Sequence, residues 1–380
     1  MELDPKEKRT LYQIAMDDIL ACIRNGEFSY DKPICTEKSL MAQYDISRIT
    51  AKRAITELEG RGILYRKRKT GSFVARPQEP EVVESTRNHR QYAFVLPFDI
   101  TKGGLMDTFK TANAILSEAG SGMSIHITDS GTASRGRAVL ARLAAADVDG
   151  IVYYPSTNDI HLELLNPFIM ENKPVVIMDI ATDCPYLHGV TSDNFNGSKL
   201  LTEHLLALGH RKIAFLTGFP PESRTTIRDR FGGYLTALRQ AGIAPDPDLI
   251  VTDLGLDYRI PLSGTPLSTP LCKALEKLRE AGATAIETEN DELAFYAILA
   301  CGEMGVRIPE QLSICGFDNS ESAHRVSGGI TTICQNFTQI GREIAEILLE
   351  SQANAGMAMR KTVVPVELLV QGSDGVPASE

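Results

Sequence analysis

Apolar residues recur at helical spacing in three stretches near the amino end of the chain. The first stripe consists of Leu11, Ile14, Ala15, Ile19, Cys22 and Ile23. A short second helix is expected over residues 36–45, with Leu40 and Met41 buried. The third helix starts at Ser47, whose hydroxyl can cap free backbone N–H groups. Its apolar stripe is Ala51, Ala54, Ile55 and Leu58. The stripes predict three helices, the last two crossing sharply because only a short turn separates them.

The pattern then changes from helical to strand-like. Gly62 ends the third helix, residues 63–65 and 72–74 are rich in β-forming types, and residues 69–71 supply a turn. Four basic side chains gather at the tip of this hairpin: Arg66, Lys67, Arg68 and Lys69. The phosphate backbone of DNA attracts such a cluster whatever the base sequence. Two helices around a tight turn, followed by a basic hairpin, therefore predict a DNA-binding domain.

Several motifs in this stretch resemble the winged helix-turn-helix of the GntR family over roughly residues 8–76. They are Gly26, residues 36–38, 46–52 and 58–59, residues 62–64, and residues 70–74. The resemblance implies that operator DNA is contacted by Lys38, Arg48 and Lys52, by Ser47 and Thr50 at the start of the recognition helix, and by Gly71 in the wing near the minor groove. Lys38 and Lys52 stand where arginine is usual, and lysine lacks the bidentate fork that suits guanine. The alternative is an ordinary amphipathic segment with a solvated basic face.

Beyond this domain the chain alternates strand-like apolar runs with helical stripes. Residues 77–90 carry two prolines and mixed charges without apolar periodicity, which indicates a linker. Strand-like runs follow at 93–96, 124–128, 150–154, 174–178, 212–217 and 312–317, with helical patterns such as 105–118, 197–208 and 291–304 between them. Repeated strand-helix units predict parallel sheets covered on both faces. The span 91–372 is long for one such sheet and suits two doubly wound lobes.

Charge is divided unequally between these regions. The whole chain holds 39 basic and 49 acidic side chains, a formal net charge of −10. Residues 1–76 hold 15 basic and 11 acidic side chains, against 24 and 38 in the remainder. The acidic total alone would argue against a protein that binds nucleic acid. The net positive charge of residues 1–76 favours nucleic-acid binding by that region.

The sequence gives little support for an enzyme or a membrane protein. It contains no His-x-x-x-His pair, no Gly-x-Ser-x-Gly and no Gly-Lys-Ser/Thr phosphate loop. The seven cysteines are scattered without a Cys-x-x-Cys pair, so neither a metal site nor a disulfide framework is expected. No apolar run is long enough to span a bilayer, and residues 2–9 are charged, unlike a signal peptide. We expect a cytoplasmic protein that is no enzyme, holds no cofactor and does not bind membranes.

Polar residues gather where predicted strands end, which is where such folds bind ligands. These groups are residues 192–197, residues 289–291 and residues 317–319, together with Arg224, Arg228 and Arg230 before residues 232–234. Carboxylates, amides and guanidinium groups can hydrogen-bond several hydroxyls of a small polar ligand.

The same landmarks resemble the effector domain of the LacI/GalR repressors, which is similar to periplasmic sugar-binding proteins, over roughly residues 91–370. They are Asp193-Asn194 with Gly197, residues 209–214, Arg230 with Gly233-Tyr234, Asn290-Asp291 with Ala294, Ile308-Pro309, Leu312-Ser313, residues 316–318, and Thr331-Thr332. The resemblance implies sugar contacts from Asn196, Arg230, Asp291, Asp318 and Gln335. Phe98 and Phe337 are candidates for stacking on a sugar, because the chain has no tryptophan.

Each of these residues has a structural alternative. Helix capping, without any ligand contact, could be the whole role of Asp193, Asn196 and Asp291. Arg230 could pair across the lobes, and the two phenylalanines could pack in the core. The sequence also departs from the family, because residues 77–90 lack a hinge-helix pattern, Glu287 and Glu289 add acidity, and residues 255–269 have no clear counterpart.

The resulting fold prediction is an α/β protein with a winged helix-turn-helix at 1–76, a linker at 77–90, a two-lobed effector domain at 91–372 and a tail at 373–380. The lobes are expected at about 91–207 with 335–362, and at 208–334 with 363–372. The fusion resembles the bacterial arabinose repressors. It implies a homodimeric repressor that binds a pseudo-palindromic operator and is released by a sugar or sugar derivative. A corepressed regulator, an activator and a non-regulatory binding protein are the alternatives.

Overall fold

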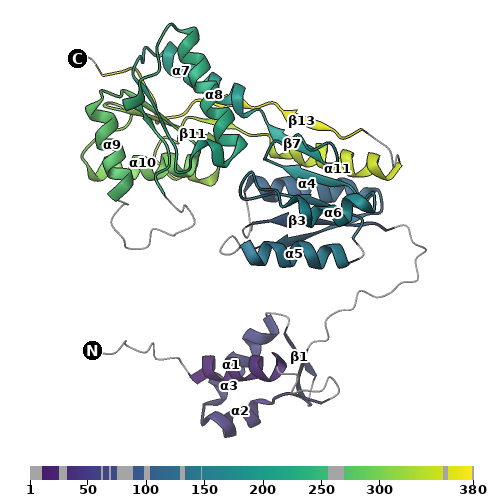
Figure 1. The fold of residues 1–380 in the computed structure, drawn as a ribbon. Coiled ribbons are helices and arrows are strands. Elements are labelled where there is room, and N and C mark those ends of the chain that lie inside the picture. Colours follow the sequence, from purple (N-terminus) through teal and green to yellow (C-terminus); the bar gives the residue numbers. More distant parts are fainter. Residues whose placement is uncertain are drawn as a thin grey trace. The chain divides into compact units, whose positions relative to one another are not determined.

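The computed structural model describes residues 11–24, 32–60, 63–67, 70–74, 89–97, 103–128, 133–146, 148–255, 269–353 and 358–378. The chain divides into two compact units, Met1–Thr86 and Arg87–Glu380 (Figure 1). Of the expected linker at 77–90, only His89 and Arg90 lie within the described residues. Among the described helices, none is long and apolar enough to cross a membrane.

The described residues of the first unit form three helices and a hairpin. The elements are α1 (Leu11–Arg24), α2 (Glu37–Tyr44), α3 (Arg48–Gly60), β1 (Leu64–Lys67) and β2 (Gly71–Val74), the two strands being antiparallel. Helix α2 begins with a capping box, in which the Thr36 side chain accepts a hydrogen bond from the backbone of Ser39. The expected helix-turn-helix and wing are confirmed. Leu40 is buried as expected, whereas Met41 is on the exposed side of α2.

The core of this unit is small and comes from every element. Its buried members include Met16, Ile19, Leu40, Ala51, Ala54, Ile55, Leu58, Leu64 and Val74. The stripe on α3 therefore packs inward as its helical spacing predicts. Arg68 and Lys69 of the expected wing tip lie outside the described residues.

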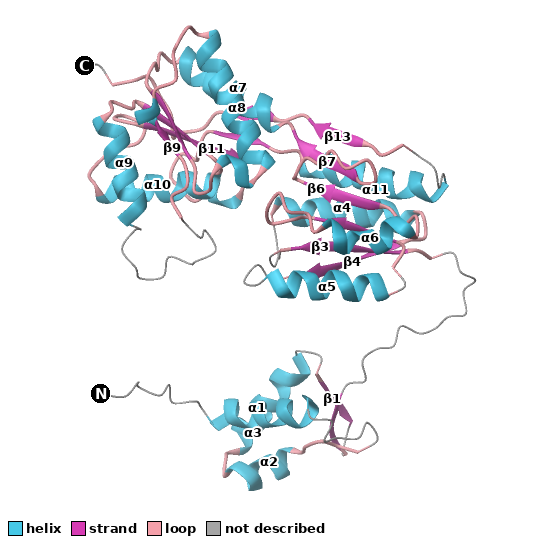
Figure 2. Ribbon diagram, in the orientation of Figure 1, coloured by secondary structure: helices cyan, strands magenta, loops and turns pink. Residues whose placement is uncertain are grey.

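The second unit starts with a six-stranded parallel sheet. Its order is β13 (Lys361–Val364), β7 (His188–Ser192), β6 (Val175–Met178), β5 (Gly150–Tyr153), β3 (Gln91–Leu96) and β4 (Gly122–Ile127). Helices α4 (Gly104–Glu118) and α11 (Phe337–Ala353) cover one face, and α5 (Ala133–Ala145) and α6 (Leu162–Met170) cover the other (Figure 2). Successive side chains of β3 point to opposite faces of the sheet, so the strand contributes to the hydrophobic cores on both faces. Phe94 packs toward α4 and α11, while Val95 packs toward α5 and α6.

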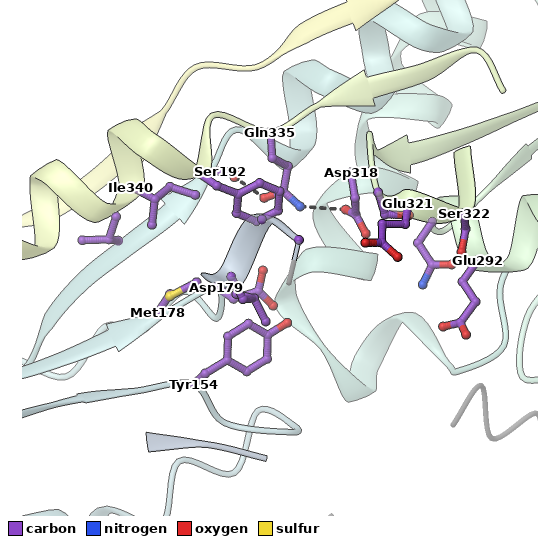
Figure 3. A pocket seen from close by; sticks show the side chains of 17 residues that line it. Tyr154, Met178, Asp179, Ser192, Glu292, Asp318, Glu321, Ser322, Gln335 and Ile340 are labelled. Carbon is purple, nitrogen blue, oxygen red and sulfur yellow. Dashed lines mark hydrogen bonds between the residues drawn. The ribbon is translucent and has the colours of Figure 1, made fainter. Parts of the chain in front are cut away.

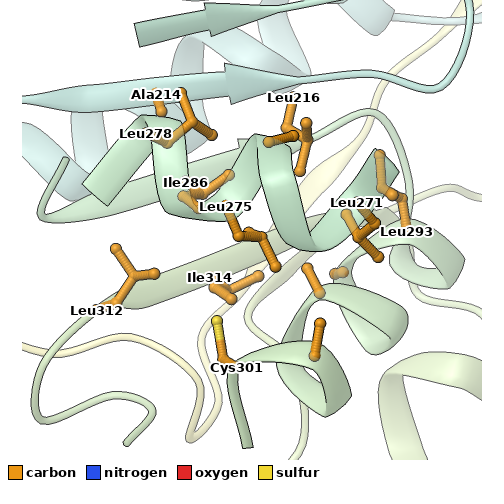
Figure 4. Packing of buried hydrophobic residues seen from close by; sticks show 14 of the residues in the cluster. Ala214, Leu216, Leu271, Leu275, Leu278, Ile286, Leu293, Cys301, Leu312 and Ile314 are labelled. Carbon is orange, nitrogen blue, oxygen red and sulfur yellow. The ribbon is translucent and has the colours of Figure 1, made fainter. Parts of the chain in front are cut away.

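A second six-stranded sheet forms the other lobe. Its order is β14 (Glu367–Leu369), β12 (Thr332–Cys334), β11 (Ser313–Asp318), β10 (Ala285–Thr288), β8 (Ile213–Leu216) and β9 (Ile250–Val251). Only the β12–β14 pair among these is antiparallel. Helices α9 (Thr269–Glu280) and α10 (Asp291–Glu303) cover one face (Figure 4). Helices α7 (Asn194–Ala207) and α8 (Thr225–Gln240) cover the other. Short 3-10 turns lie at η1 (Pro221–Ser223), η2 (Pro247–Leu249) and η3 (Glu321–His324).

Within its described residues the second unit crosses between the lobes three times, and the first crossing differs from the expected boundary at 207. Helix α7 belongs to the second lobe, because Leu201 and Leu205 share a buried cluster with Tyr234 of α8 and Phe317 of β11. The crossing therefore follows β7 directly, at Asp193. The last crossing follows the end of β13 at Val364, two residues after the expected boundary.

Candidate functional site

Two adjoining hollows lie between the lobes of the second unit. Their volumes are about 430 and 470 Å³. They share six lining residues: Tyr154, Asp179, Asn290, Glu292, Asp318 and Gln335. We call the two together the interlobe cavity. Figure 3 shows the first of the two hollows. Tyr154 and Asp179 follow strands β5 and β6 of the first lobe, and Asp318 ends β11 of the second. The cavity thus lies at the carboxyl ends of parallel strands, where doubly wound folds bind small molecules.

A hydrogen-bond chain crosses the cavity from one lobe to the other. Ser192 at the end of β7 donates to the Gln335 side chain, and Gln335 Nε2 donates to Asp318 Oδ1 at 2.7 Å (Figure 3). Asp318 Oδ1 also lies 3.3 Å from Nη2 of Arg230 on α8. These groups are held in place by one another before any ligand arrives, so their polar atoms are preorganised for recognition.

Arg230 joins this hydrogen-bond chain to further groups, and the residue is only 7% exposed. Its Nε donates to Asn194 Oδ1 at 2.8 Å, and its Nη1 donates to the backbone carbonyl of Glu289. The guanidinium carbon lies 3.6 Å from the centre of the Phe317 ring. A buried charge is tolerated here because each of the three guanidinium nitrogens donates a hydrogen bond and a carboxylate faces the group.

Burial changes the acidity of the carboxyl groups around the cavity. It raises the pKa of Asp318, while the Arg230 guanidinium and the Gln335 amide oppose the increase. Burial and the neighbouring Asp318 charge raise the pKa of Asp291 to about 7. Burial followed by the nearby Asp179 charge also raises the pKa of the Tyr154 hydroxyl, so Tyr154 is a neutral hydroxyl at the cavity wall.

Four of the expected effector residues line the cavity. Asp318 and Gln335 line both hollows, Arg230 lines one and Phe337 lines the other. Phe337 also packs against the core of the first lobe, so the core-packing alternative holds for it as well. That these four side chains hold an effector stays a prediction.

Of the other expected effector residues, Asn196 is not part of the described cavity wall. Asn196 is exposed on α7, where its amide donates to Asp193 Oδ2 at 2.7 Å. A helix turns about 100° per residue, so Asn194, two positions earlier, faces inward to Arg230 while Asn196 faces out. Asn196 is therefore not among the residues described at the cavity, and its contact with an effector stays a prediction. Phe98 lies outside the described residues.

Asp291 is likewise outside the described cavity lining, and its contact with an effector stays a prediction. Its side chain is fully buried and is absent from the described lining of both hollows. One carboxylate oxygen accepts from Thr332 Oγ1 at 2.5 Å, and the other accepts from the Ser320 backbone N–H at 2.6 Å. Asp291 thereby fixes the loop that carries Asp318 and Ser320. Among the described residues, Asp291 thus stabilises the cavity wall from behind and does not line the cavity.

Other residues in the cavity were missed by the sequence reasoning. Tyr154 and Asp179 each follow a short buried strand directly, and that position is the signal that could have identified them. Arg224 reaches across the lobes, where its Nε donates to the Ser156 carbonyl oxygen at 2.8 Å. Arginine crowding in its loop was visible in the sequence, but nothing there indicated which lobe the side chain meets.

One asparagine ties the lobes together beside the cavity. Asn158 of the first lobe donates from its side chain to the Glu222 carbonyl and from its backbone to the Ser223 carbonyl, at 2.8 and 3.1 Å. Its Oδ1 accepts from the Thr225 backbone N–H at 2.8 Å. These three hydrogen bonds, which we call the Asn158 latch, fix the start of α8 and hence the helix that carries Arg230.

The first unit presents a basic surface on α3 and the wing. Arg48 and Lys52 are exposed on α3, and Lys38 is exposed on α2. Ser47 acts as expected at the helix start, because its Oγ accepts from the Thr50 backbone N–H at 3.2 Å. Gly71 begins β2 with φ at +130°, and a Cβ there would lie 2.8 Å from Pro33 Cβ. The wing turn therefore needs glycine at this position.

An acidic residue organises this basic surface. The Glu37 carboxylate accepts from Arg48 Nε at 2.9 Å and lies 3.5 Å from Nη1 of Arg66 in the wing. The hydrogen bond from Arg48 lowers the pKa of Glu37. Arg66 also pairs with Glu59 at 3.2 Å. Contact between the six expected DNA-binding residues and DNA stays a prediction.

Comparisons with known protein families agree with this division of the chain. Residues 11–74 match the bacterial regulatory proteins of the gntR family, and residues 202–373 match the periplasmic binding protein-like domain. The chain thus joins a GntR-type winged helix-turn-helix to a periplasmic-binding-protein-like effector domain. It is a transcriptional regulator of that composite class.

Three individual proteins show which transcriptional regulators the chain is similar to. An arabinose metabolism transcriptional repressor of Geobacillus stearothermophilus is 27% identical over 350 residues, which cover 88% of each chain. The HTH-type transcriptional repressor PurR of Aliivibrio salmonicida is 33% identical over 214 residues, 56% of this chain and 60% of that protein. A solved transcriptional regulator CelR-cellobiose complex shares the fold, with a TM-score of 0.64, 22% identity, and coverage of 86% of this chain and 91% of that one. The two-domain architecture resembles that of the arabinose repressors.

Proposed function

We propose that this chain is a repressor that binds a pseudo-palindromic operator as a homodimer in the cytoplasm and is released by a sugar or sugar derivative. The single observation that carries the proposal is the presence, in one chain, of a basic winged reader and a polar interlobe cavity. The near full-length similarity to an arabinose metabolism repressor supports it.

Release follows from the way the two lobes share the cavity. A ligand that bonds to Asp179 on one lobe and Asp318 on the other favours one lobe arrangement over others. In a two-fold dimer, a change in that arrangement alters the spacing of the two readers relative to the two half-sites. Binding of ligand and binding of DNA are then reciprocally coupled, typically by about 1 to 3 kcal/mol.

The charge of the cavity favours an uncharged polyhydroxylated ligand. The described lining holds five carboxylates: Asp179, Glu289, Glu292, Asp318 and Glu321. It holds two arginines, Arg224 and Arg230, and Arg230 already faces Asp318. A phosphate or carboxylate on the ligand would enter a region of like charge, whereas hydroxyls can donate to the carboxylates. The proposed effector is therefore a neutral sugar or a neutral derivative.

A thermal-shift panel with the full-length protein tests this proposal. Neutral pentoses and hexoses are compared with their phosphates and with uronic acids. We expect a neutral sugar to raise the melting temperature, because a ligand that binds only the folded state stabilises it. The same sugar should weaken binding to operator DNA. Stabilisation by phosphates but by no neutral sugar would contradict the ligand assignment, and tighter DNA binding with sugar would contradict release.

A further inference from the structure

Ile49 is an apolar side chain at a position where it does not contribute to the packing of the fold. It is 82% exposed, more than any other large hydrophobic side chain among the described residues. It lies in the first turn of α3, while the opposite face of that helix buries Ala51, Ala54 and Ile55. Exposed aliphatic surface contributes no burial energy to the folded state. Packing within this chain therefore does not explain an isoleucine at this position.

The neighbours of Ile49 are cationic. Lys52 and Arg53 are three and four positions further along α3 and share its side of the helix. Arg48 precedes it and is steadied by Glu37 at 2.9 Å. The result is one apolar group within a positively charged surface at the start of a recognition helix. Such a surface suits a partner with an anionic perimeter and a small apolar feature between its charges.

The major groove of DNA offers that combination. Phosphates line its edges, and the C5-methyl group of thymine is the apolar group that a base pair presents there. Recognition helices enter this groove with their amino-terminal residues toward the bases. Ile49 occupies the second position of α3, so its side chain is carried by the turn that lies deepest in the groove in that docking mode.

We propose that Ile49 contacts the C5-methyl group of one thymine in each operator half-site and thereby sets a preference for thymine at that position. This inference rests on the proposed function, because it requires α3 to be the recognition helix. It assigns base readout to a side chain other than the lysines that replace the usual arginines at positions 38 and 52.

Removal of single methyl groups from the DNA tests the contact. Operator duplexes are first selected from a random library by the full-length protein, and each thymine is then replaced by deoxyuridine, which lacks only the methyl group. We expect one symmetric pair of replacements to weaken binding about fourfold per half-site, the worth of one buried methylene-sized group. The Ile49→Ala variant should bind the thymine and deoxyuridine duplexes equally well. Met41→Ala, which trims an exposed apolar side chain on α2, should keep the discrimination.

The outcomes separate this inference from the proposed function. If Ile49→Ala still distinguishes thymine from deoxyuridine at every position, or if no thymine shows an effect, the contact does not exist although the protein binds DNA. If no duplex is selected and Arg48→Ala does not change DNA affinity, the proposed function fails and the inference fails with it. Ile49 is exposed, so an unchanged melting temperature of Ile49→Ala confirms that the comparison uses folded protein.

Discussion

Arg230 shows how one side chain can organise a site. It joins Asn194 on α7, the carbonyl of Glu289 after β10 and Asp318 at the end of β11. Removing it leaves the Asp318 carboxylate without its countercharge in a partly buried position, which is costly. The residue therefore contributes to the shape of the wall and to its charge.

The Arg230→Ala variant should lose the ligand-induced rise in melting temperature and should be less stable by about 3 to 5 kcal/mol. Differential scanning fluorimetry with and without the neutral sugar measures both effects. Arg228→Ala is the matched control, because Arg228 lies on the same helix, is exposed and pairs with its neighbour Asp229. Equal behaviour of the two variants would remove Arg230 from the site.

Glu287 makes stability depend on pH. Its carboxylate on β10 accepts hydrogen bonds from Ser198 and Thr202 of α7, the latter at 2.6 Å. Burial raises its pKa from 4.5 to about 7, although the two hydroxyls oppose the increase. The folded state thus holds a proton that the unfolded state has released between these pH values. The stability contribution is complete below pH 4.5 and is lost as the pH rises through about 7.

Glu287→Gln removes this titration because the amide stays neutral at every pH. We expect the variant to gain stability relative to the natural chain as the pH rises from 5 to 8, measured by urea unfolding. Glu280→Gln, at an exposed position on α9, is the control. A difference between Glu287→Gln and the natural chain that is constant with pH would show that Glu287 does not titrate in this range.

At the scale of elements, the Asn158 latch links the first lobe to η1 and α8. Its three hydrogen bonds exist only when the lobes are close together. Asn158→Ala removes the two side-chain bonds, so the closed arrangement loses stabilisation that ligand binding needs. We expect ligand affinity to fall about fivefold to thirtyfold by isothermal titration calorimetry, converting 1 to 2 kcal/mol for two hydrogen bonds. Unchanged affinity would mean that closure does not depend on the latch.

The elements were more predictable from the sequence than the residues of the site. Periodicity located α3, and buried apolar runs located strands such as β5 and β6, because each pattern reflects the face that packs. The boundary at 207 was misplaced because α7 begins right after β7, and its stripe at Leu201 and Leu205 does not say which sheet it covers. That choice depends on tertiary packing, which a local pattern does not contain.

The placement of single site residues depends on a related cause. Arg230, Asp318 and Gln335 were expected at the cavity and line it, because strand ends and motif spacing constrain them. Asn196 and Asp291 lie outside the described lining, since one or two helical positions decide whether a side chain faces a cavity or a cap. Sequence patterns fix the neighbourhood of a site more firmly than the direction of each side chain.

At the scale of the whole molecule, charge is separated by function. The net positive residues 1–76 form the reader, and the strongly acidic remainder forms the effector domain. We expect affinity for random DNA to fall steeply with salt, by about 0.9 logarithmic units per tenfold change in salt for each phosphate contacted. Fluorescence anisotropy at several salt concentrations measures this slope. A flat salt dependence would contradict phosphate binding by the basic surface.

The proposed function requires that the interlobe cavity and the winged reader are coupled within one chain. The most direct test titrates the stabilising neutral sugar into a complex of full-length protein and selected operator DNA, and follows dissociation by anisotropy. We expect sugar to weaken operator binding at least fivefold, the lower end of typical coupling, and Arg230→Ala to abolish this response while still binding DNA. Operator affinity that stays constant at saturating sugar, in a protein that the sugar stabilises, would contradict the coupling.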